Sequence, residues 1–146
     1  MTKPHCRLRL QRLLSISDPG LYFAYTLRNA NAEFFFYGKK VTWVQHTEWF
    51  INRSKNHPEF EFFIIWQKKL RDIRELRVGT IAVEHRKDCE FLQNLCIVDW
   101  ARRQGIARWA ITQLMLPGRF VVGEIQTSNK HVIKMYQDLG FWKAGA

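Results

Sequence analysis

The chain has 146 residues, of which 47% are hydrophobic and 14% aromatic, enough for one domain with a buried core. No run approaches the roughly 18 apolar residues of a membrane span, and the N-terminus lacks the apolar core of a signal peptide, so we expect a cytoplasmic protein. The net charge of +10 favours anionic partners, but the scattered basic residues are more typical of a solvated surface than of a nucleic-acid-binding stripe.

The first half of the chain predicts one strand and two helices. Polar and apolar residues alternate over 7–13, as in a half-buried strand. The apolar and aromatic segment 21–28 follows a Pro-Gly turn and fits a short helix. Thr42 lies three residues before Gln45, the spacing of a capping box, and the apolar positions that follow predict a helix over 43–52.

The second half predicts a mixed sheet flanked by helices. Its elements are strands over 60–66, 77–83 and 90–98, a helix over 106–115, a strand over 120–126 and a helix over 132–139. The first two strands are expected to be antiparallel neighbours joined by a long connection. Gly140 is expected to end the last helix in the left-handed conformation. The order of elements predicts an α/β (α+β) fold with a mixed, mostly antiparallel sheet.

Neither a second domain nor a metal centre is indicated. The sequence has no internal repeat, low-complexity tract or Pro/Gly/Ser linker, so one domain over 1–146 is expected. Cys6, Cys89 and Cys96 form neither an even set nor a CxxC pair. They predict reduced thiols, with no disulfide framework and no zinc site.

The turn that leads into the helix over 106–115 predicts a phosphate-binding site. A helix start exposes free backbone N–H groups, and the helix dipole favours negative charge there. Arg102 and Arg103 add positive charge, and Gly105 lets the backbone approach a phosphate closely. By itself this pattern also fits an ordinary helix start at the surface.

Two ordered motifs give the turn a more specific interpretation. The spacing Arg102-x-x-Gly105-x-Ala107 resembles the acyl-CoA signature of the GNAT superfamily of N-acetyltransferases. The segment from Asn129 through Tyr136 to Leu-Gly-Phe resembles the second signature of that family. The resemblance covers about half of the chain closely and implies the GNAT fold, with acetyl-CoA as co-substrate and no metal.

The resemblance also implies roles for individual residues. The strand end before the turn would pair with the pantetheine arm; its residues are Cys96, Ile97 and Val98. The turn would hold the pyrophosphate; its residues are Arg102, Arg103, Gln104, Gly105, Ile106 and Ala107. Asn129 would lie near the pantetheine arm. Tyr136 would donate a proton to the leaving CoA thiolate, because a thiol has an intrinsic pKa of about 8.5 and leaves more easily when protonated.

A base is needed because the acceptor amine attacks only in its neutral form. Glu124 is the first candidate, since it lies within the strand predicted over 120–126 and among apolar neighbours that would raise its pKa. His85 and Glu90 are competing candidates. A solvent-facing acid is an equally good interpretation of Glu124, and some enzymes of the family use no dedicated base.

The acceptor is indicated by the first half of the chain. The segments around Arg28 and over 41–50 resemble GNAT enzymes that acetylate nucleotide-linked amino sugars, and more loosely those that acetylate protein N-termini. A UDP-linked sugar is a dianion with a base that stacks, which suits a basic, aromatic cleft. Arg28, His46 and Trp49 are the candidate substrate residues, although His46 and Trp49 also fit packing at the core.

One departure from the family leaves alternatives open. Only Trp142 to Ala146 follow the Leu-Gly-Phe motif, so the last C-terminal strand of the family is expected to be missing. An open sheet edge invites pairing, which makes a homodimer an expectation. A non-catalytic acyl-CoA-binding module is the second interpretation of the chain. A basic RNA-binding domain is the third, but no nucleic-acid motif supports it.

Overall fold

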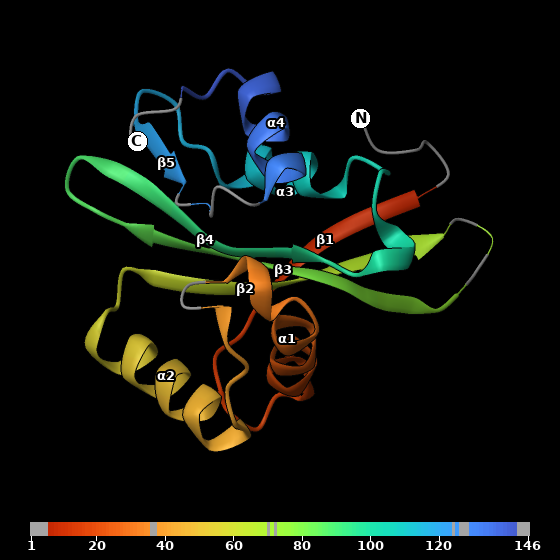
Figure 1. Ribbon diagram of the computed structural model, residues 1–146, viewed down its shortest axis with the longest axis vertical. Helices are drawn as coiled ribbons and strands as arrows, with labels where there is room; N and C mark the ends of the chain where they lie inside the picture. Colours follow the sequence, from red (N-terminus) through yellow and green to blue (C-terminus); the bar gives the residue numbers. More distant parts are fainter. Residues whose placement is uncertain are drawn as a thin grey trace.

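The computed structural model describes residues 6–35, 38–69, 71, 73–123, 125 and 129–142. They form a sheet with helices on both faces (Figure 1). The elements are β1 (Cys6–Arg12), α1 (Pro19–Ala30), α2 (Trp43–Asn56), β2 (Phe60–Lys69), β3 (Glu75–His85), β4 (Cys89–Ile97), α3 (Ile106–Leu114), β5 (Phe120–Gly123) and α4 (Lys130–Asp138), with short 3₁₀ turns at Ala32–Phe34 and Asp99–Ala101.

The sheet changes direction at its last pair of strands. Its order is β1-β2-β3-β4-β5, with β1 to β4 antiparallel and β4 parallel to β5. The parallel pairing runs only from Cys89 to Leu92 of β4, against Phe120 to Gly123 of β5. Beyond Leu92, β4 continues to Ile97 paired with β3 alone among the described strands. β4 therefore extends beyond the end of β5.

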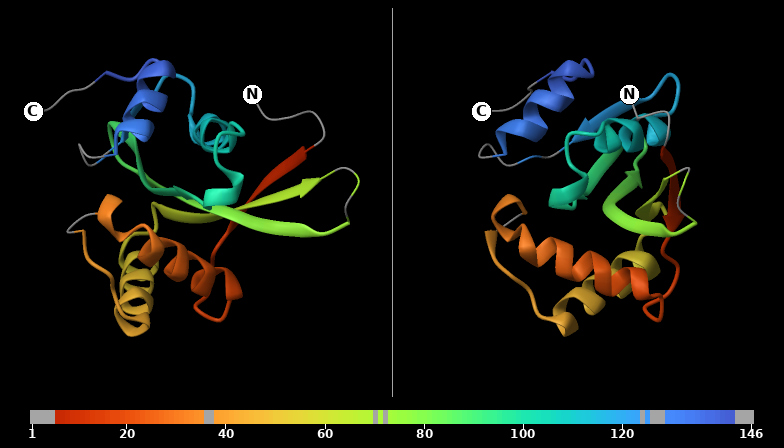
Figure 2. Two further views of the ribbon diagram at one scale, coloured as in Figure 1. Left: turned by 45° about the vertical axis from the view of Figure 1, so that its right-hand side comes forward. Right: turned by 90° about the vertical axis from the view of Figure 1, so that its right-hand side faces the viewer.

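Two helical layers bury the two faces of the sheet (Figure 2). On β2, Phe62 and Ile64 pack in the cluster that includes α1 and α2, whereas Ile65 packs in the cluster that includes α3. Tyr136 of α4 belongs to this second cluster. Because successive strand side chains point to opposite faces, a sheet covered on both faces has apolar residues at most positions. This explains the long apolar run in β2.

The predicted fold class is confirmed, and most differences concern the ends of elements. The helix predicted over 21–28 begins earlier, at Pro19, because the side chain of Asp18 accepts a hydrogen bond from the Gly20 N–H and caps the first turn. The helix predicted over 43–52 continues to Asn56, and its Thr42 capping box is present as predicted. Gly140 has a φ of 96°, as predicted for the end of the last helix.

Two predictions about strands were wrong. The connection predicted to be long is short, because β2 and β3 extend towards each other and Lys68 pairs with the oppositely charged Glu75. The strand predicted over 120–126 ends at Gly123, where the ring of Tyr136 lies so close that a Cβ would be 3.2 Å from it. The expected absence of a further strand concerns the end of the chain, where 143–146 lie outside the described residues.

Candidate functional site

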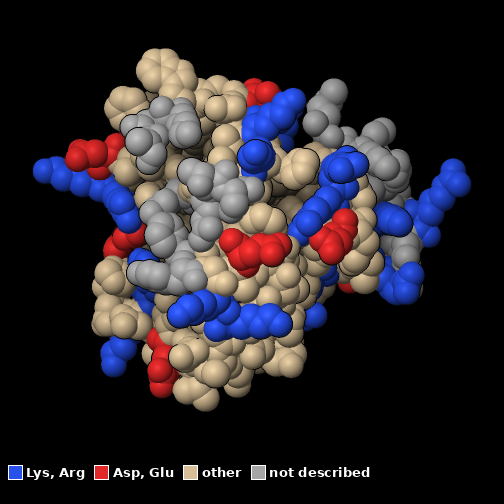
Figure 3. Space-filling view, in the orientation of Figure 1, with Lys and Arg blue, Asp and Glu red and all other residues tan. Residues whose placement is uncertain are grey.

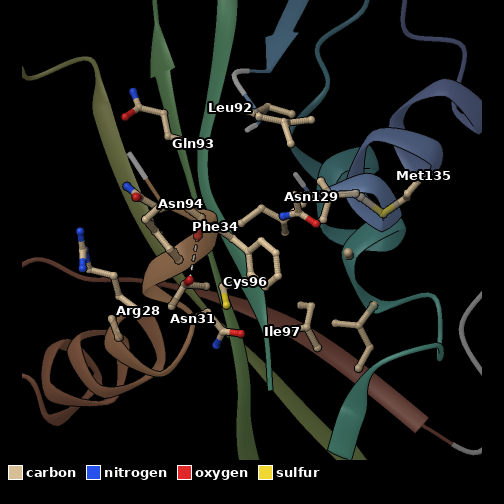
Figure 4. Close-up of a pocket in the computed structure, with 18 of the residues that line it drawn as sticks. Arg28, Asn31, Phe34, Leu92, Gln93, Asn94, Cys96, Ile97, Asn129 and Met135 are labelled. Atoms are coloured by element: carbon tan, nitrogen blue, oxygen red, sulfur yellow. Dashed lines mark hydrogen bonds between the residues drawn. The ribbon is translucent and has the colours of Figure 1, made fainter. Parts of the chain in front are cut away.

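A cavity of about 1300 Å³ follows the part of β4 that extends beyond the end of β5. Successive side chains of β4 point to opposite faces of the strand: Leu92 packs in the core cluster with α3, and Gln93 points the other way (Figure 4). The part of the cavity next to α3 and α4 is called the α3–α4 side, and the part next to α1 and α2 is called the α1–α2 side. Side chains of α1, β4 and α4 all reach it, so one space joins both helical layers.

The α3–α4 side contains an uncapped helix start. Gly105, the N-cap of α3, has a φ of 78° and makes no side-chain cap, and Arg103 before it has a φ of 64°. The first helical bond runs from the Trp109 N–H to the Gly105 carbonyl, so the N–H groups of Ile106 and Ala107 have no partner within the helix. These residues line the cavity, where their N–H groups and the helix dipole favour an anion.

Arg102 holds this turn in place. Its Nε donates to the Ile97 carbonyl at 3.0 Å, and one Nη donates to Oδ1 of Asn31 at 2.8 Å. The other Nη forms an ion pair with Asp99 at 2.7 Å. Arg102 thus joins the end of β4 to the end of α1. Gln104 is also engaged, because its Oε1 accepts a hydrogen bond from Gln67 at 2.9 Å.

A β-bulge interrupts β4 beside the cavity, and the sequence did not predict it. Thr80 pairs with Cys96 and Ala82 with Gln93, so two residues of β4 lie opposite Ile81 alone. The first of them, Asn94, has a φ of 53°, and its carbonyl accepts a hydrogen bond from Thr80 at 2.8 Å. Asparagine in mid-strand tolerates this conformation better than most residues, and it was the one available signal.

Tyr136 lies in the wall of the α3–α4 side. Its side chain is 5% exposed, and its ring packs edge-on against Phe141 with centroids 4.8 Å apart. Burial raises the pKa of the phenol well above its usual range, so Tyr136 keeps its proton at neutral pH. A neutral phenol held in this way is a proton donor rather than a nucleophile.

The other residues predicted to hold the cofactor lie along the same wall, with one exception. Cys96, Ile97 and Asn129 line the cavity, whereas Val98 lies just beyond it, where its N–H donates to the Val78 carbonyl at 2.8 Å. Burial raises the pKa of the Cys96 thiol to about 11, although the nearby Arg102 opposes the effect. Cys96 therefore stays protonated and is a poor nucleophile.

Arg28, His46 and Trp49 all line the α1–α2 side, and each also has contacts within the protein. Arg28 donates to the Lys39 carbonyl at 2.9 Å. Desolvation, together with the charge of Arg28, lowers the pKa of His46 to about 4, so this imidazole is neutral at neutral pH. The His46 ring lies 5.5 Å from that of Trp49 and 5.7 Å from that of Tyr25.

Two of the three candidate bases, His85 and Glu90, do not belong to the described cavity lining. Glu124, the first candidate, lies outside the described residues. His85 and Glu90 contact each other away from the described cavity lining, and Glu90 also accepts from Arg119 at 2.6 Å. The second ring nitrogen of His85 contacts Glu61. These interactions occupy His85 and Glu90, so their geometry favours a structural role.

The charge of the cavity lining is strongly positive among the described residues. Six arginines line it, namely Arg28, Arg53, Arg86, Arg102, Arg103 and Arg108, whereas Asp138 is the only acidic residue in the described lining. Over the outer surface, by contrast, Figure 3 shows acidic side chains interspersed with the basic ones. The cavity is therefore the place where the net charge of +10 is expected to attract an anionic ligand.

Comparison with solved structures identifies the fold. A domain from Methanocaldococcus jannaschii matches with a TM-score of 0.80 at 19% identity, covering 95% of this chain and 90% of that one. Spermidine N-acetyltransferase from Vibrio cholerae, in complex with CoA and spermine, matches with a TM-score of 0.71 at 17% identity, covering 94% and 82%. This is an acetyltransferase fold.

A third match extends the comparison. A protein from Clostridium difficile described as a possible acetyltransferase has a TM-score of 0.66 at 11% identity, and the match covers 95% of this chain and 93% of that one. No protein-family model matches the sequence, and no curated protein matches it significantly. The acetyltransferase fold predicted from the two signatures is thus confirmed by structure alone.

Possible metal ligands lie close together at one place among the described residues. One group of side chains, His57, Glu59 and Glu84, places possible ligand atoms within 4.8 Å of one another. Glu84 is already hydrogen-bonded to Arg86, and His57 lies 3.2 Å from Glu59, so these groups have protein partners.

None of the helices in the described part of the chain is long and apolar enough to cross a membrane.

Proposed function

We propose that this chain is a cytoplasmic, acetyl-CoA-dependent N-acetyltransferase that acts on a primary amine of a nucleotide-linked amino sugar. One observation carries the proposal: a single cavity joins an uncapped helix start, a bulged strand and a buried phenol. These three features provide an anion site, free backbone groups and a proton donor. Acyl transfer from a phosphorylated thioester requires all three.

The α3–α4 side suits the co-substrate. The N–H groups at the start of α3 would hold the pyrophosphate of acetyl-CoA, and Arg103 would add charge beside it. The pantetheine arm would extend along β4, whose edge beyond Leu92 has no described partner strand opposite β3. Asn129 of the facing segment also lines this path. The thioester would then lie near the bulge at Asn94.

Transfer is proposed to be direct. The amine nitrogen attacks the thioester carbonyl carbon, the new C–N bond forms, and the C–S bond breaks with its electron pair going to sulfur. Tyr136 donates its proton to that sulfur and is reprotonated from solvent. A route through an acyl-cysteine is disfavoured, because the thiol of Cys96 has its pKa raised to about 11.

The ammonium formed in the attack must lose a proton. Glu124 remains the proposed base, acting directly or through a water molecule. His85 and Glu90 are weaker candidates, because both are engaged with other charged side chains away from the cavity.

An anionic acceptor fits the α1–α2 side better than a cationic one. The proteins of similar structure named above include a spermidine N-acetyltransferase, and spermidine is a polycation. Binding a polycation calls for carboxylates, whereas the described residues on this side offer Arg28, Arg53 and Arg86. Trp49 adds an aromatic surface suited to a nucleotide base.

The test is release of free thiol from acetyl-CoA with three acceptors in parallel: UDP-linked amino sugars, peptides with free N-termini, and spermidine. Turnover with the sugar nucleotide alone is the expected result. Turnover with peptides alone would assign the chain to protein N-terminal acetylation instead. CoA binding without turnover for any acceptor would identify a non-catalytic acyl-CoA-binding module.

A further inference from the structure

Two arginines stand in the wall of the α1–α2 side, and the sequence did not single out either one. Arg53 comes from the last turns of α2, and Arg86 follows the end of β3. Gln93 of β4 lines the cavity beside them. Glu84 of β3 is 8% exposed and does not belong to the described lining. Two arginines of the cavity lining are thus paired with a carboxylate that does not belong to that lining.

A single oxygen of Glu84 orients all three neighbours. Its Oε2 accepts from Nη2 of Arg86 at 3.0 Å and from Nε2 of Gln93 at 3.2 Å, and it lies 3.7 Å from Nη1 of Arg53. Each guanidinium carries five N–H donors. Glu84 engages one nitrogen of each arginine, which leaves further donors for a ligand.

Aromatic rings fix the same two side chains from another direction. The guanidinium carbon of Arg86 lies 4.0 Å from the centroid of the Phe91 ring, and that of Arg53 lies 5.6 Å from the Phe60 ring. Stacking of this kind orients the plane of a guanidinium. Both arginines are therefore held before any ligand binds, which lowers the entropy lost on binding.

The charges at this wall favour an anion. Arg53 and Arg86 belong to the described cavity lining, whereas the carboxylate of Glu84 that pairs with them does not. Glu59 and His57 lie close to Glu84, but they pair with each other and do not belong to the described lining. The side chains of Arg53 and Arg86 are 31% and 47% exposed, so a ligand can reach them without burying a bare charge.

We propose that Arg53 and Arg86 form a clamp for the diphosphate of a nucleotide-linked acceptor. Two parallel N–H donors of a guanidinium match two oxygens of a phosphate, and two such groups side by side suit a diphosphate. The clamp rests on the proposed function for the identity of the acceptor. It is separate from the phosphate site at the start of α3, which lies on the other side of β4.

The clamp is tested by titration calorimetry of UDP into protein saturated with CoA, which blocks the phosphate site at α3. Arg53→Gln and Arg86→Gln are each expected to weaken UDP binding about tenfold or more, because each removes a charged hydrogen-bond donor. Both variants should bind CoA within about twofold of the wild type. Arg12→Gln is the matched control: Arg12 is 43% exposed and paired with Glu61, but it does not line the cavity.

Two competitors of UDP show which part of the ligand the clamp binds. Pyrophosphate is expected to displace UDP, and uridine to displace it only weakly, because the arginines contact phosphate rather than base. The role of Glu84 is tested with a matched pair of variants. Glu84→Ala should weaken UDP binding, whereas Glu84→Gln keeps an oxygen facing the arginines and should restore it.

Several outcomes would overturn the clamp. They are a wild-type protein that does not bind UDP, unchanged affinity in both arginine variants, or an equal loss in Arg12→Gln. The thiol-release assay keeps this result apart from the proposed function. Turnover of a sugar nucleotide with unchanged affinity in the variants would remove the clamp and leave the function. Clamp-dependent UDP binding without any turnover would do the reverse.

Discussion

The two sides of the cavity offer different kinds of groups to the ligands proposed for them. On the α3–α4 side, the proposed anion site consists of backbone N–H groups at the start of α3, positioned by Gly105. On the α1–α2 side, the charged groups are side chains such as Arg53 and Arg86, which come from separate elements. A site made of backbone N–H groups is formed by consecutive residues, whereas a site made of side chains depends on how segments distant in the sequence pack together. The first kind therefore leaves a sequence motif and the second does not.

The largest effect is expected from Tyr136, for which a role in the reaction as well as in binding is proposed. Tyr136→Phe removes only the hydroxyl and keeps the packing against Phe141. Loss of a general acid typically lowers turnover by about 100-fold or more. Measurement of kcat and of the dissociation constant for CoA should show a large fall in the first and little change in the second. Unchanged kcat would remove Tyr136 from the reaction.

Gly105 tests whether the α3–α4 site is made of backbone. Gly105→Val places a branched side chain at a φ of 78°, which strains the turn by about 1–2 kcal/mol and puts a side chain where a phosphate would approach. We expect affinity for CoA to fall at least about tenfold in a calorimetric titration, while UDP binding on the other side changes little.

Gly118 provides the control for this substitution. It has nearly the same φ, 75°, and no atom lies within 4 Å of the position that a Cβ would take. Gly118→Val should therefore produce similar strain and a similar loss of stability without weakening CoA binding. If both variants weakened CoA binding equally, general destabilisation rather than a phosphate site would explain the result.

Arg102 sharpens the comparison, because it belongs to the sequence signature and yet bridges the two sides. Its bonds to the Ile97 carbonyl and to Asn31 join β4 to the end of α1. Arg102→Gln is expected to lower the free energy of unfolding by about 1–2 kcal/mol, measured by urea denaturation. A double-mutant cycle with Asn31→Ala should show less than additive losses. Fully additive losses would mean that the bridge contributes nothing.

The fold was predictable because its signals are local. The capping box at Thr42, the change of period at Gly105 and the left-handed Gly140 each lie within a few consecutive residues, and all three were found in the structure. The ends of elements were less predictable. β2 and β3 extend further than expected because Lys68 and Glu75 pair across the two strands. The pattern of polar and apolar residues within one strand does not reveal such a pair.

The site was predictable only in part for the same reason. The signatures located the α3 turn and Tyr136, both of which line the cavity. They did not locate the bulge at Asn94, which depends on the pairing between β3 and β4. They also missed Arg53 and Arg86. These two residues share Glu84 as a partner only because α2 packs against the sheet.

The smallest effect is expected from His85, which lies on the α3–α4 face of the sheet but away from the described cavity lining. Desolvation, the largest single influence, lowers the pKa of His85, but contacts with Glu61 and Glu90 together raise it above 6.5. In the unfolded chain the pKa stays near 6.5, so the stabilisation is fully present below that pH. It is lost as the pH rises through the higher pKa of the folded protein.

The measurement is the free energy of unfolding at several pH values between about 5.5 and 8.5, for the wild type and for His85→Gln. The difference between them should shrink as the pH rises, by no more than about 1 kcal/mol because the His85 side chain is 35% exposed. If His85 belongs to the scaffold, its variant should also retain turnover within a few-fold. A loss of turnover as large as that of Tyr136→Phe would instead return His85 to the catalytic residues and extend the site beyond the cavity.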